Sequence, residues 1–470
     1  MAKNLRLYFL ISLEYFKRNW QLVLFGTAVF LVSVFFAIKF NLISTSVIFS
    51  EGFIGTYQQH DLPLEVTRLI SSGLVEATKD GKVVPKLAAS WQTNSDATQF
   101  TFKLKPDLRW SDGSIVKSSD LEIVIPDVEV SYPNDKEVLI KLKESYSPFP
   151  TLLTKPLYKR GSLMGVGPYQ VTKIEKSRIF ITKILLTPVD SKLPTVAVRF
   201  YPNEKTALIG FSLGEVQSLA GVINYAQLLN NSQIKLLQKT DYGKIVTLLF
   251  NTKDPVLSNK SIRQSLSFAA PLVDKETTAN NPISILSWAY NSDSKKYLSN
   301  MDSAKQALEK AKSTSSPDLL DKEIILTSTP NLEIIGKKII KDWKELGFKV
   351  KMRVESGIAQ NFSALLITQS IPLDPDQYFL WHSTQDKTNL TKYSSACCPM
   401  SARVDKDLED GRKIITEEDR KAKYLDFQKT LLEDAPAAFL YYPKYNILYL
   451  EKSKANLDKL LPLQLSAQYN

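Results

Sequence analysis

The chain has 470 residues, of which 44% are hydrophobic and 23% charged, a composition typical of globular proteins that excludes intrinsic disorder. This length allows two or three domains. The formal net charge is +11, but the lysines are scattered over most polar stretches and no arginine cluster stands out, so the sequence predicts a solvated basic surface and no nucleic-acid partner.

An uncharged run of nineteen residues, Trp20 to Ile38, follows a basic N-terminal segment. Its length is close to the ~20 residues that a helix needs to cross the hydrocarbon of a membrane. Four basic residues precede the run and only Lys39 follows it, which predicts that residues 1–19 lie in the cytoplasm. A cleaved signal peptide is the alternative, but it would have a shorter apolar core and a small-residue cleavage site. We therefore expect one transmembrane helix over 20–38, with the rest of the chain outside the cell.

Beyond about residue 45 the pattern is that of a mixed α/β protein, and strands come first. Residues 99–105 alternate apolar and polar side chains, as a half-buried strand does. Residues 128–143 form two alternating runs around a Pro-Asn-Asp turn, and residues 167–186 repeat this arrangement with a turn near Lys176-Ser177. Both of these segments predict β-hairpins.

The second half of the chain adds helices. Ser261 is a candidate N-cap for a helix that Pro271 ends, and a second helix is predicted over 302–312. Residues 323–354 follow the order strand, helix, glycine, strand, which predicts a βαβ unit with a right-handed crossover between parallel strands. A last helix around 424–432 leads to a final strand region. The fold class is accordingly α/β, with mixed sheets and more than one lobe.

One short motif suggests catalysis. The sequence GFSLG, residues 210–214, fits the GxSxG nucleophile elbow of serine hydrolases, with Ser212 as nucleophile and His382 downstream as base. Hairpins precede it, however, whereas a hydrolase sheet supplies buried parallel strands before the elbow. A serine hydrolase is therefore kept only as a lesser alternative.

The sequence predicts no metal site and no cofactor. His60 and His382 have no neighbours at metal-ligand spacing, and the only cysteines are the adjacent pair Cys397-Cys398. These two cysteines are either free thiols or a vicinal disulfide. Without a convincing catalytic constellation, the chain points to a binding function.

Several blocks, in order, resemble the family 5 extracytoplasmic solute-binding proteins, the peptide and nickel binders that serve ABC importers. Residues 248–274, LLFNTKDPVLSNKSIRQSLSFAAPLVD, are similar to that family's Phe-Asn-Thr…Val-Arg-Gln-Ala-Leu signature. The GFSLG motif falls within a block of the same family, which accounts for it without a nucleophile. The other matching blocks lie at residues 69–92, 101–121, 165–171, 207–222, 373–383, 389–405 and 424–442.

The resemblance implies a two-lobed periplasmic-binding-protein type II fold with a hinge between the lobes. Lobe I would span 45–250 and include a reduced small subdomain at about 76–164. Lobe II would span 251–439, and residues 440–470 would return to lobe I. The chain would thus cross between the lobes at Phe250-Asn251.

The resemblance also implies where solute is bound. The loop after the "DPD" block would line the interlobe cleft, with further residues from lobe I and from an aromatic loop of lobe II. The predicted ligand-binding residues are Tyr57, Trp288, Asp374, Asp376, Tyr378 and Trp381. For Tyr378 and Trp381 a purely structural role in the core is an equally good interpretation, and Trp343 is predicted to be core.

One departure from the family concerns ligand charge. Peptide-binding relatives carry an aspartate shortly before the "DPD" block that pairs with the α-amino group of the peptide. Residues 369–373 contain no acid here, and a buried ammonium without a counter-charge is costly. Asp374 and Asp376 are expected to cap their own loop, which leaves no fixed negative charge for an amine.

The sequence therefore predicts a monomeric, membrane-tethered solute-binding protein that delivers peptides or other small solutes to ABC permease subunits. The alternative is a surface receptor or scaffold that keeps the binding-protein fold without transport.

Overall fold

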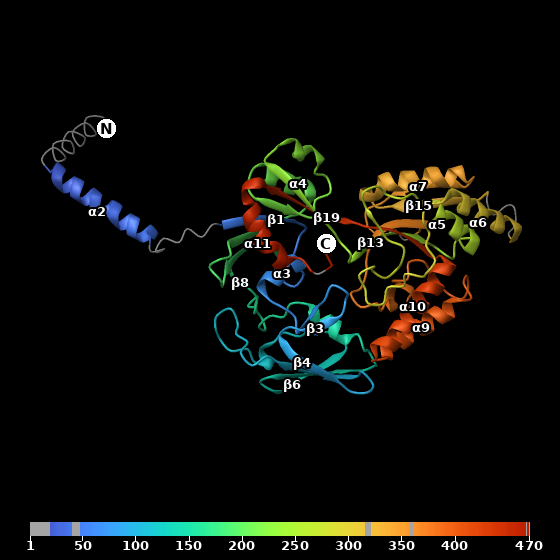
Figure 1. The fold of residues 1–470 in the computed structure, drawn as a ribbon, viewed down its shortest axis with the longest axis horizontal. Coiled ribbons are helices and arrows are strands. Elements are labelled where there is room, and N and C mark those ends of the chain that lie inside the picture. The colour runs from blue at the N-terminus through green and yellow to red at the C-terminus, as the bar shows by residue number, and fades with distance from the viewer. Residues whose placement is uncertain (1–18, 40–47, 315–320, 358–360, 467, 470) are drawn as a thin grey trace. The chain divides into compact units, whose positions relative to one another are not determined.

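The computed structural model describes residues 19–39, 48–314, 321–357, 361–466 and 468–469. The chain divides into two compact units, Met1–Ile48 and Phe49–Asn470. Figure 1 labels the elements, and the numbering of the figure is kept below.

The first unit contains helix α2, Trp20–Lys39, so the helix predicted over 20–38 is present. Within the part of the chain that the structure describes, no helix combines the length and the apolar character needed to cross a membrane. The predicted transmembrane span is therefore not supported by the structure. The predicted cytoplasmic segment lies outside the described residues, apart from residue 19.

Lobe I is built on a seven-stranded sheet with the strand order β12-β19-β11-β1-β10-β9-β8. The pair β1 and β11 is parallel, and the predicted hairpin over 167–186 is the antiparallel pair β8 and β9. The strands are β1 (Ile48–Ile54), β8 (Tyr169–Ser177), β9 (Phe180–Pro188), β10 (Thr195–Tyr201), β11 (Ser218–Ala220), β12 (Ile234–Thr240) and β19 (Lys444–Leu450). The helices of this lobe are α3 (Leu64–Ile70), α4 (Glu204–Ser212) and α11 (Lys454–Gln464).

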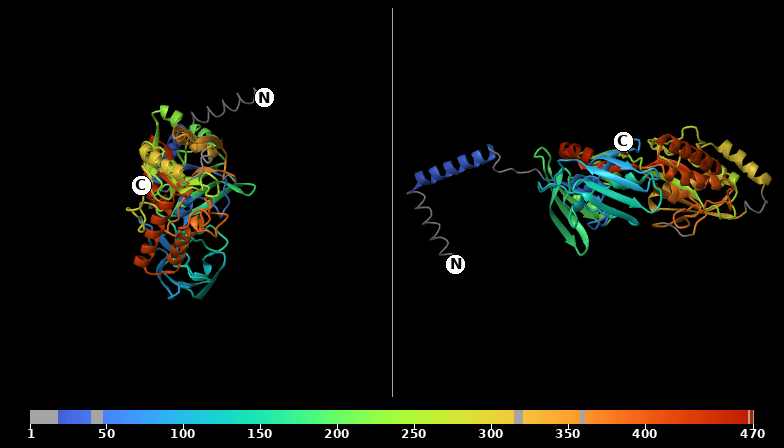
Figure 2. Two further views of the ribbon diagram at one scale, coloured as in Figure 1. Left: turned by 90° about the vertical axis from the view of Figure 1, so that its right-hand side faces the viewer. Right: turned by 90° about the horizontal axis from the view of Figure 1, so that it is seen from below.

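A small subdomain follows α3 and has a sheet and a core of its own. Its four strands take the order β4-β5-β7-β6, and a two-stranded ribbon of β2 and β3 lies beside them. In the view from below in Figure 2, these light-blue and cyan strands lie nearest to the viewer. The predicted strand at 99–105 and hairpin at 128–143 are both confirmed here. The strands are β2 (Val75–Ala77), β3 (Val83–Pro85), β4 (Ala88–Thr93), β5 (Gln99–Leu104), β6 (Val128–Asn134) and β7 (Glu137–Leu142).

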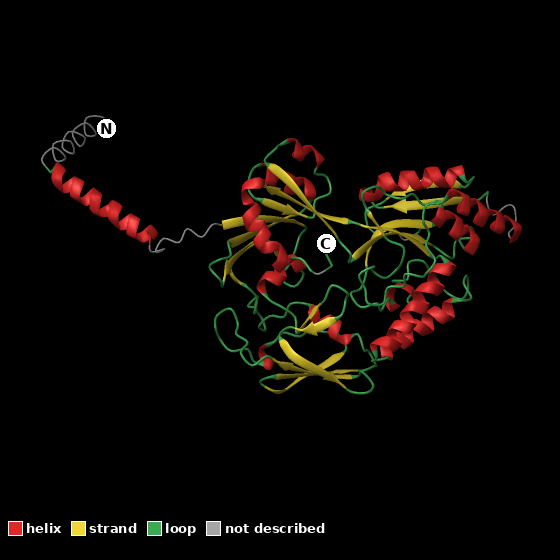
Figure 3. Ribbon diagram, viewed as in Figure 1, coloured by secondary structure: helices red, strands yellow, loops and turns green. Residues whose placement is uncertain are grey.

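Lobe II has a six-stranded mixed sheet with the order β14-β18-β13-β17-β15-β16. Helices cover both of its faces, as Figure 3 shows in red. The strands are β13 (Lys244–Phe250), β14 (Thr277–Thr278), β15 (Glu323–Ser328), β16 (Lys349–Val354), β17 (Ala364–Ser370) and β18 (Ala437–Tyr442). The helices are α5 (Lys260–Phe268), α6 (Met301–Thr314), α7 (Glu333–Glu345), α8 (Tyr378–Trp381), α9 (Ser401–Lys413) and α10 (Glu417–Asp434).

The central strand β13 shows why lobe II needs helices on both faces. Val246 and Leu248 belong to the core under α5, α6 and α7, whereas Ile245 and Leu249 belong to the core under α9 and α10. Successive side chains of a strand point to opposite faces, so a continuous apolar run fills two cores at once. Trp343 is wholly buried in the first core, as predicted.

The local predictions for lobe II hold with one correction. The segment β15-α7-β16 is the predicted βαβ unit, because β15 and β16 pair in parallel. Helix α5 is capped by Asn259 and not by Ser261, since the Asn259 side-chain oxygen accepts from the backbone N–H groups of Ser261 and Ile262 at 2.8 and 3.1 Å.

The chain crosses between the two lobe sheets at two places. Strand β12 of lobe I continues into β13 of lobe II through Asp241–Gly243, and β18 of lobe II continues into β19 of lobe I through Pro443. The crossing had been predicted at Phe250-Asn251 and the return at 440. Because β13 pairs along its length with β17 of lobe II, it belongs to that lobe, and the first crossing lies before it.

Glu51 is an ionisable side chain in the middle of the lobe I sheet. It lies on β1 opposite Ser218, is 1% exposed and accepts a hydrogen bond from Gln464 of α11. Burial raises the pKa of Glu51 to about 7, the Gln464 hydrogen bond opposes this rise, and the nearby Glu65 adds to it. Folding therefore favours the protonated form of this carboxyl.

We expect Glu51→Gln to stabilise the protein at alkaline pH. A carboxyl whose pKa is raised in the folded state contributes its full stability below the unfolded pKa and loses it as pH rises through the folded pKa. Between about pH 5 and about pH 8 the free energy of unfolding of the wild type should fall by about 2.5 kcal/mol relative to the variant. Urea unfolding across this range measures the difference. Glu175→Gln, at an exposed position of β8, is the control and should track the wild type. Parallel profiles for wild type and Glu51→Gln would contradict the prediction.

Candidate functional site

A cavity of about 300 Å³ lies where the small subdomain meets lobe II. Cavities that bind small molecules in proteins have volumes from about this size upwards, with mostly apolar walls and a few placed polar groups. The walls of this one are Gly81, Lys82, Val83, Trp91, Thr93, Ala97, Phe100, Ser147, Pro148, Pro150, Thr151, Trp288, Asp374, Ile415, Glu417 and Arg420.

Direct contacts between the two parts bound this cavity. At the turn between β2 and β3, the carbonyl of Asp80 accepts from the backbone N–H of Trp288 at 2.9 Å. Lys82 makes a 2.7 Å ion pair with Glu417 in the first turn of α10. Gly81 has φ +86°, and a Cβ atom there would stand 2.8 Å from the carbonyl oxygen of Leu373. Glycine therefore allows the turn to approach the lobe II loop closely.

Aromatic rings from both the subdomain and lobe II line the cavity. Trp91 on β4 is stacked on Phe102 with ring centroids 6.2 Å apart, and this contact fixes its orientation from the subdomain side. Trp288 on the lobe II side packs edge-on against Tyr424, again at 6.2 Å. Two indole rings held by their own cores give the cavity rigid flat surfaces, which suit ring-shaped or apolar groups of a solute.

A buried ion pair forms the polar part of the lobe II wall. Nη2 of Arg420 lies 2.7 Å from Oδ1 of Asp374, and both side chains are buried. The guanidinium group also donates to the carbonyl of Gly411 and the hydroxyl of Tyr424, and lies 5.4 Å from the Trp288 ring centroid. Burial alone would lower the pKa of Arg420, but Asp374 and Tyr424 raise it above its usual value. The arginine therefore stays charged and neutralises the aspartate.

The second aspartate of the same loop is paired in the same way. Asp376 lies 3.1 Å from Nε of Arg412, at the end of α9. Burial raises the pKa of Asp376 above its usual value, and Arg412 opposes this rise. The Arg412 guanidinium also lies 4.4 Å from the Tyr378 ring centroid. The backbone carbonyl of Arg412 accepts from the N–H of Ser147 in the subdomain at 2.7 Å.

Both aspartates also cap the loop that carries them. Oδ1 of Asp374 accepts from the N–H of Asp376 at 3.0 Å, and Oδ1 of Asp376 accepts from the N–H of Tyr378 at 3.1 Å. Since each carboxylate already holds a backbone donor and an arginine, neither is available as a counter-charge for a solute amine.

The predicted ligand-binding residues are divided by the structure. Trp288 and Asp374 line the cavity, whereas the other four do not. Asp376 and Tyr378 lie behind the wall around Arg412. Trp381 is 1% exposed, and its Nε1 donates to Gln377 within the lobe II core. Tyr57 lies in lobe I, where its hydroxyl donates to the carbonyl of Ile54. The binding role of these six residues stays a prediction.

The arginines and Trp91 were missed by sequence reasoning. Arg412 and Arg420 lie on α9 and α10, roughly forty residues after the aspartates that they neutralise, and no helical periodicity identifies such partners. Trp91 stands in a block that resembles the family pattern, but its alternation on β4 is equally typical of a core residue.

The GFSLG motif does not form a nucleophile elbow. Ser212 is the last residue of α4, and its Oγ donates to the carbonyl of Leu208 at 2.8 Å. His382 lies in lobe II, where its ring nitrogens contact Thr384 and Glu409. An elbow needs its serine on a strand-to-helix turn beside a base, so the hydrolase interpretation is wrong.

Removing one partner of the buried pair should be costly. Arg420→Gln leaves Asp374 buried without a cation, and we expect a loss of about 3–5 kcal/mol in the free energy of unfolding. The double variant Asp374→Asn/Arg420→Gln should recover part of this loss, because no lone charge remains. Arg403→Gln, which breaks the exposed pair with Asp426, is the control and should cost far less. Equal losses for Arg403→Gln and Arg420→Gln in urea unfolding would contradict the buried-pair assignment.

Comparison with known proteins identifies the relatives of the chain. Its sequence matches the bacterial extracellular solute-binding proteins, family 5 (middle), over residues 82–125 and 123–389. It is 24% identical to the oligopeptide-binding protein AppA of Bacillus subtilis (strain 168), over 83% of this chain and 84% of that protein.

Solved structures agree on the fold. The ABC transporter substrate binding protein CtaP from Listeria monocytogenes matches with a TM-score of 0.69 at 18% identity, over 86% of this chain and 93% of that one. NikZ from Campylobacter jejuni, in complex with Ni(L-His), matches with a TM-score of 0.65 at 20% identity, over 86% and 94%. These relatives are solute-binding proteins and not enzymes. Because the family match spans more than half of the sequence, the chain belongs to the bacterial extracellular solute-binding proteins of family 5.

Proposed function

We propose that this protein captures a small neutral solute in the cavity between its small subdomain and lobe II and delivers it to the permease of an ABC importer. The family to which it belongs serves peptide and nickel import, and the relatives named above bind an oligopeptide and a nickel complex. The cavity supplies the physical basis, since both parts of the protein contribute to its walls. A solute held there would join the two parts, which is how hinge closure encloses a ligand.

The observation that carries the proposal is the balance of charge around the cavity. Its four charged wall residues form two ion pairs, Lys82–Glu417 and Asp374–Arg420. A solute with a net charge would have to lose its hydration without gaining a free counter-charge. The site therefore suits a blocked or internal peptide segment, a saccharide-like molecule or an apolar compound.

The aromatic contacts assigned to the solute differ from the initial expectation. Tyr378 and Trp381 are among the predicted ligand-binding residues, but Trp381 packs in the lobe II core and the Arg412 guanidinium lies 4.4 Å from the Tyr378 ring centroid. Trp91 and Trp288 take this role in the proposal, because both lie on the cavity wall.

We also propose that residues 20–38 hold the protein at the outer face of the membrane. This part of the proposal rests on the uncharged sequence of the segment and on the exposed apolar side chains of α2, such as Leu24, Phe25 and Phe30. Apolar side chains exposed on a helix favour a lipid environment over water.

Calorimetric titration with short peptides tests the solute class. N-acetylated, amidated peptides of two or three residues should bind more tightly than the same peptides with free termini. Trp288→Ala should weaken that binding at least about ten-fold, since it removes one stacking surface. Phe180→Ala, at an exposed position of β9 in lobe I, is the control and should bind as the wild type does. Tight binding of free di- or tripeptides that is lost on acetylation would overturn the charge argument.

Protease accessibility tests the topology. In intact spheroplasts, added protease should remove the large C-terminal part of the chain, because the domain is expected to lie outside the cytoplasmic membrane. The membrane fraction should retain the full-length protein after washing with high salt. Full protection from protease, or complete release by salt, would refute this placement.

A further inference from the structure

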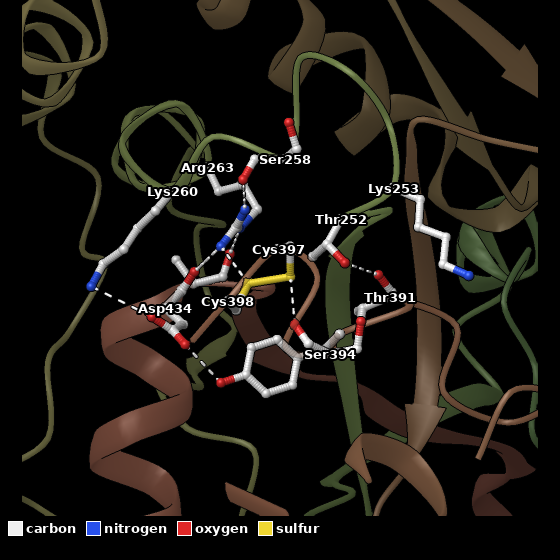
Figure 4. Close-up of a disulfide and its surroundings, with 12 residues drawn as sticks. Thr252, Lys253, Ser258, Lys260, Arg263, Thr391, Ser394, Cys397, Cys398 and Asp434 are labelled. Carbon is white, nitrogen blue, oxygen red and sulfur yellow. Dashed lines mark hydrogen bonds and ion pairs between the residues drawn. A yellow bond between two sulfur atoms is a disulfide. The ribbon is translucent and has the colours of Figure 1, made fainter. Parts of the chain in front are cut away.

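A second chemical site lies in lobe II, in the loop that precedes α9. Cys397 and Cys398 are joined by a disulfide there, as Figure 4 shows. Cys398 is 2% exposed, whereas Cys397 is half-buried. This pair lies outside the cavity described above and takes no part in its walls.

A buried arginine contacts the inner sulfur. Nη2 of Arg263, on α5, donates to Sγ of Cys398 at 3.2 Å, and the arginine side chain is fully buried. Its other hydrogen bonds within the described residues go to neutral acceptors. These are the backbone carbonyls of Leu257, Ser258, Asp434 and Ala435. The guanidinium is therefore held in a cage of carbonyl oxygens and one sulfur.

The side-chain carboxylate of Asp434 has two partners other than Arg263. Asp434 accepts from the hydroxyl of Tyr393 at 2.7 Å and lies 3.5 Å from Nζ of Lys260. Burial lowers the pKa of Arg263 to about 10, and Asp434 opposes this change from a distance. Among the residues that the structure describes, no carboxylate forms an ion pair with Arg263. An anion at the sulfur position would therefore stabilise this buried cation.

In the disulfide form, each sulfur already lies within hydrogen-bond distance of a group that would bind it after reduction. Sγ of Cys397 lies 3.2 Å from the carbonyl oxygen of Ser394, but a disulfide sulfur carries no hydrogen to donate. After reduction, a Cys397 thiol would donate to that oxygen, and a Cys398 thiolate would accept from Arg263. Figure 4 shows these two contacts on opposite ends of the disulfide.

We propose that Cys397–Cys398 is a redox site that switches, within the folded protein, between a disulfide and a thiol–thiolate pair stabilised by Arg263. The co-reactant is a dithiol reductant outside the cytoplasm, which attacks the sulfur of Cys397, the less buried of the two cysteines. The protein S–S bond takes up two electrons and breaks, and the reductant forms its own disulfide and releases two protons. One proton stays on Cys397 and the other leaves to solvent, so that Cys398 remains an anion. The Arg263 cation stabilises the Cys398 thiolate and thereby favours the reduced form of the pair.

Redox titration of the full-length folded protein tests the switch. The protein is equilibrated with reduced and oxidised dithiothreitol at graded ratios, quenched with acid, alkylated with N-ethylmaleimide and weighed by intact mass spectrometry. Two maleimide adducts should appear over a defined range of ratios while the near-ultraviolet circular dichroism stays native. If the adducts appear only after the native signal is lost, the pair is a static structural disulfide and the proposal fails.

Two single-cysteine variants test the role assigned to each sulfur. Cys397→Ser leaves Cys398 beside Arg263, and Cys398→Ser leaves Cys397 beside the Ser394 carbonyl. The thiolate absorbance of Cys398 should titrate with an acid constant at least about ten-fold larger than that of Cys397. The titratable neighbours Arg263, Lys260, Asp434 and Tyr393 are the same in both variants, so the difference in acidity reports the position of the thiol. Equal titrations, or a stronger acid at Cys397, would overturn the assignment.

The arginine itself can be tested in the Cys397→Ser background. Arg263→Lys keeps the charge and should preserve most of the acidity of Cys398, whereas Arg263→Gln should remove it. If Arg263→Gln does not fold, the single-cysteine comparison above decides the question alone.

Discussion

The two strand crossings between the lobe sheets are bonded to each other, and the rest of the structure depends on this constraint. The N–H of Asp241 donates to the carbonyl of Pro443 at 2.9 Å, and Nζ of Lys444 donates to the hydroxyl of Thr240 at 2.8 Å. The rings of Tyr242 and Tyr442 pack 4.9 Å apart. A pair of short, mutually bonded crossings lets two rigid sheets move about one axis while their internal cores stay intact.

The cavity has charged residues in its walls, but these charges are paired with each other and leave no net charge for a solute. Its lobe II wall contains a buried aspartate and a buried arginine, yet they satisfy each other and the loop backbone. Buried pairs of this kind contribute little net stability, but breaking one is expensive. This pair fixes positions in the wall, because Arg420 holds Asp374 in place and lies over the Trp288 ring. Specificity then rests on the indole surfaces and on the exclusion of unpaired charge.

Sequence reasoning was most successful where local periodicity and turn chemistry decide the structure. The hairpins, the βαβ unit and the helices at 302–312 and 424–432 all have their counterparts in the structure. It also predicted that Asp374 and Asp376 cap their loop, since an aspartate next to proline has a backbone N–H within reach. The family resemblance supplied the two-lobed architecture.

The features that the sequence did not predict depend on contacts between residues that are far apart in the chain. Strand β13 is apolar on both faces, so its periodicity does not tell which sheet it joins, and the crossing was placed seven or more residues too late. The partners of the two aspartates come from α9 and α10, and the neighbour of the cysteine pair comes from α5. For Trp381 the sequence left a ligand role and a core role equally open, and in the structure the side chain packs in the lobe II core. A single amino-acid sequence carries no local signal for contacts between residues so far apart in the chain.

The central claim is that the cavity holds a neutral solute, and native mass spectrometry of the freshly purified protein tests it most directly. The account predicts a co-purifying small molecule without net charge, lost from Trp91→Ala and Trp288→Ala and retained by Phe180→Ala. A solute bearing a free amino group or a net charge, or one retained equally by all three variants, would contradict it.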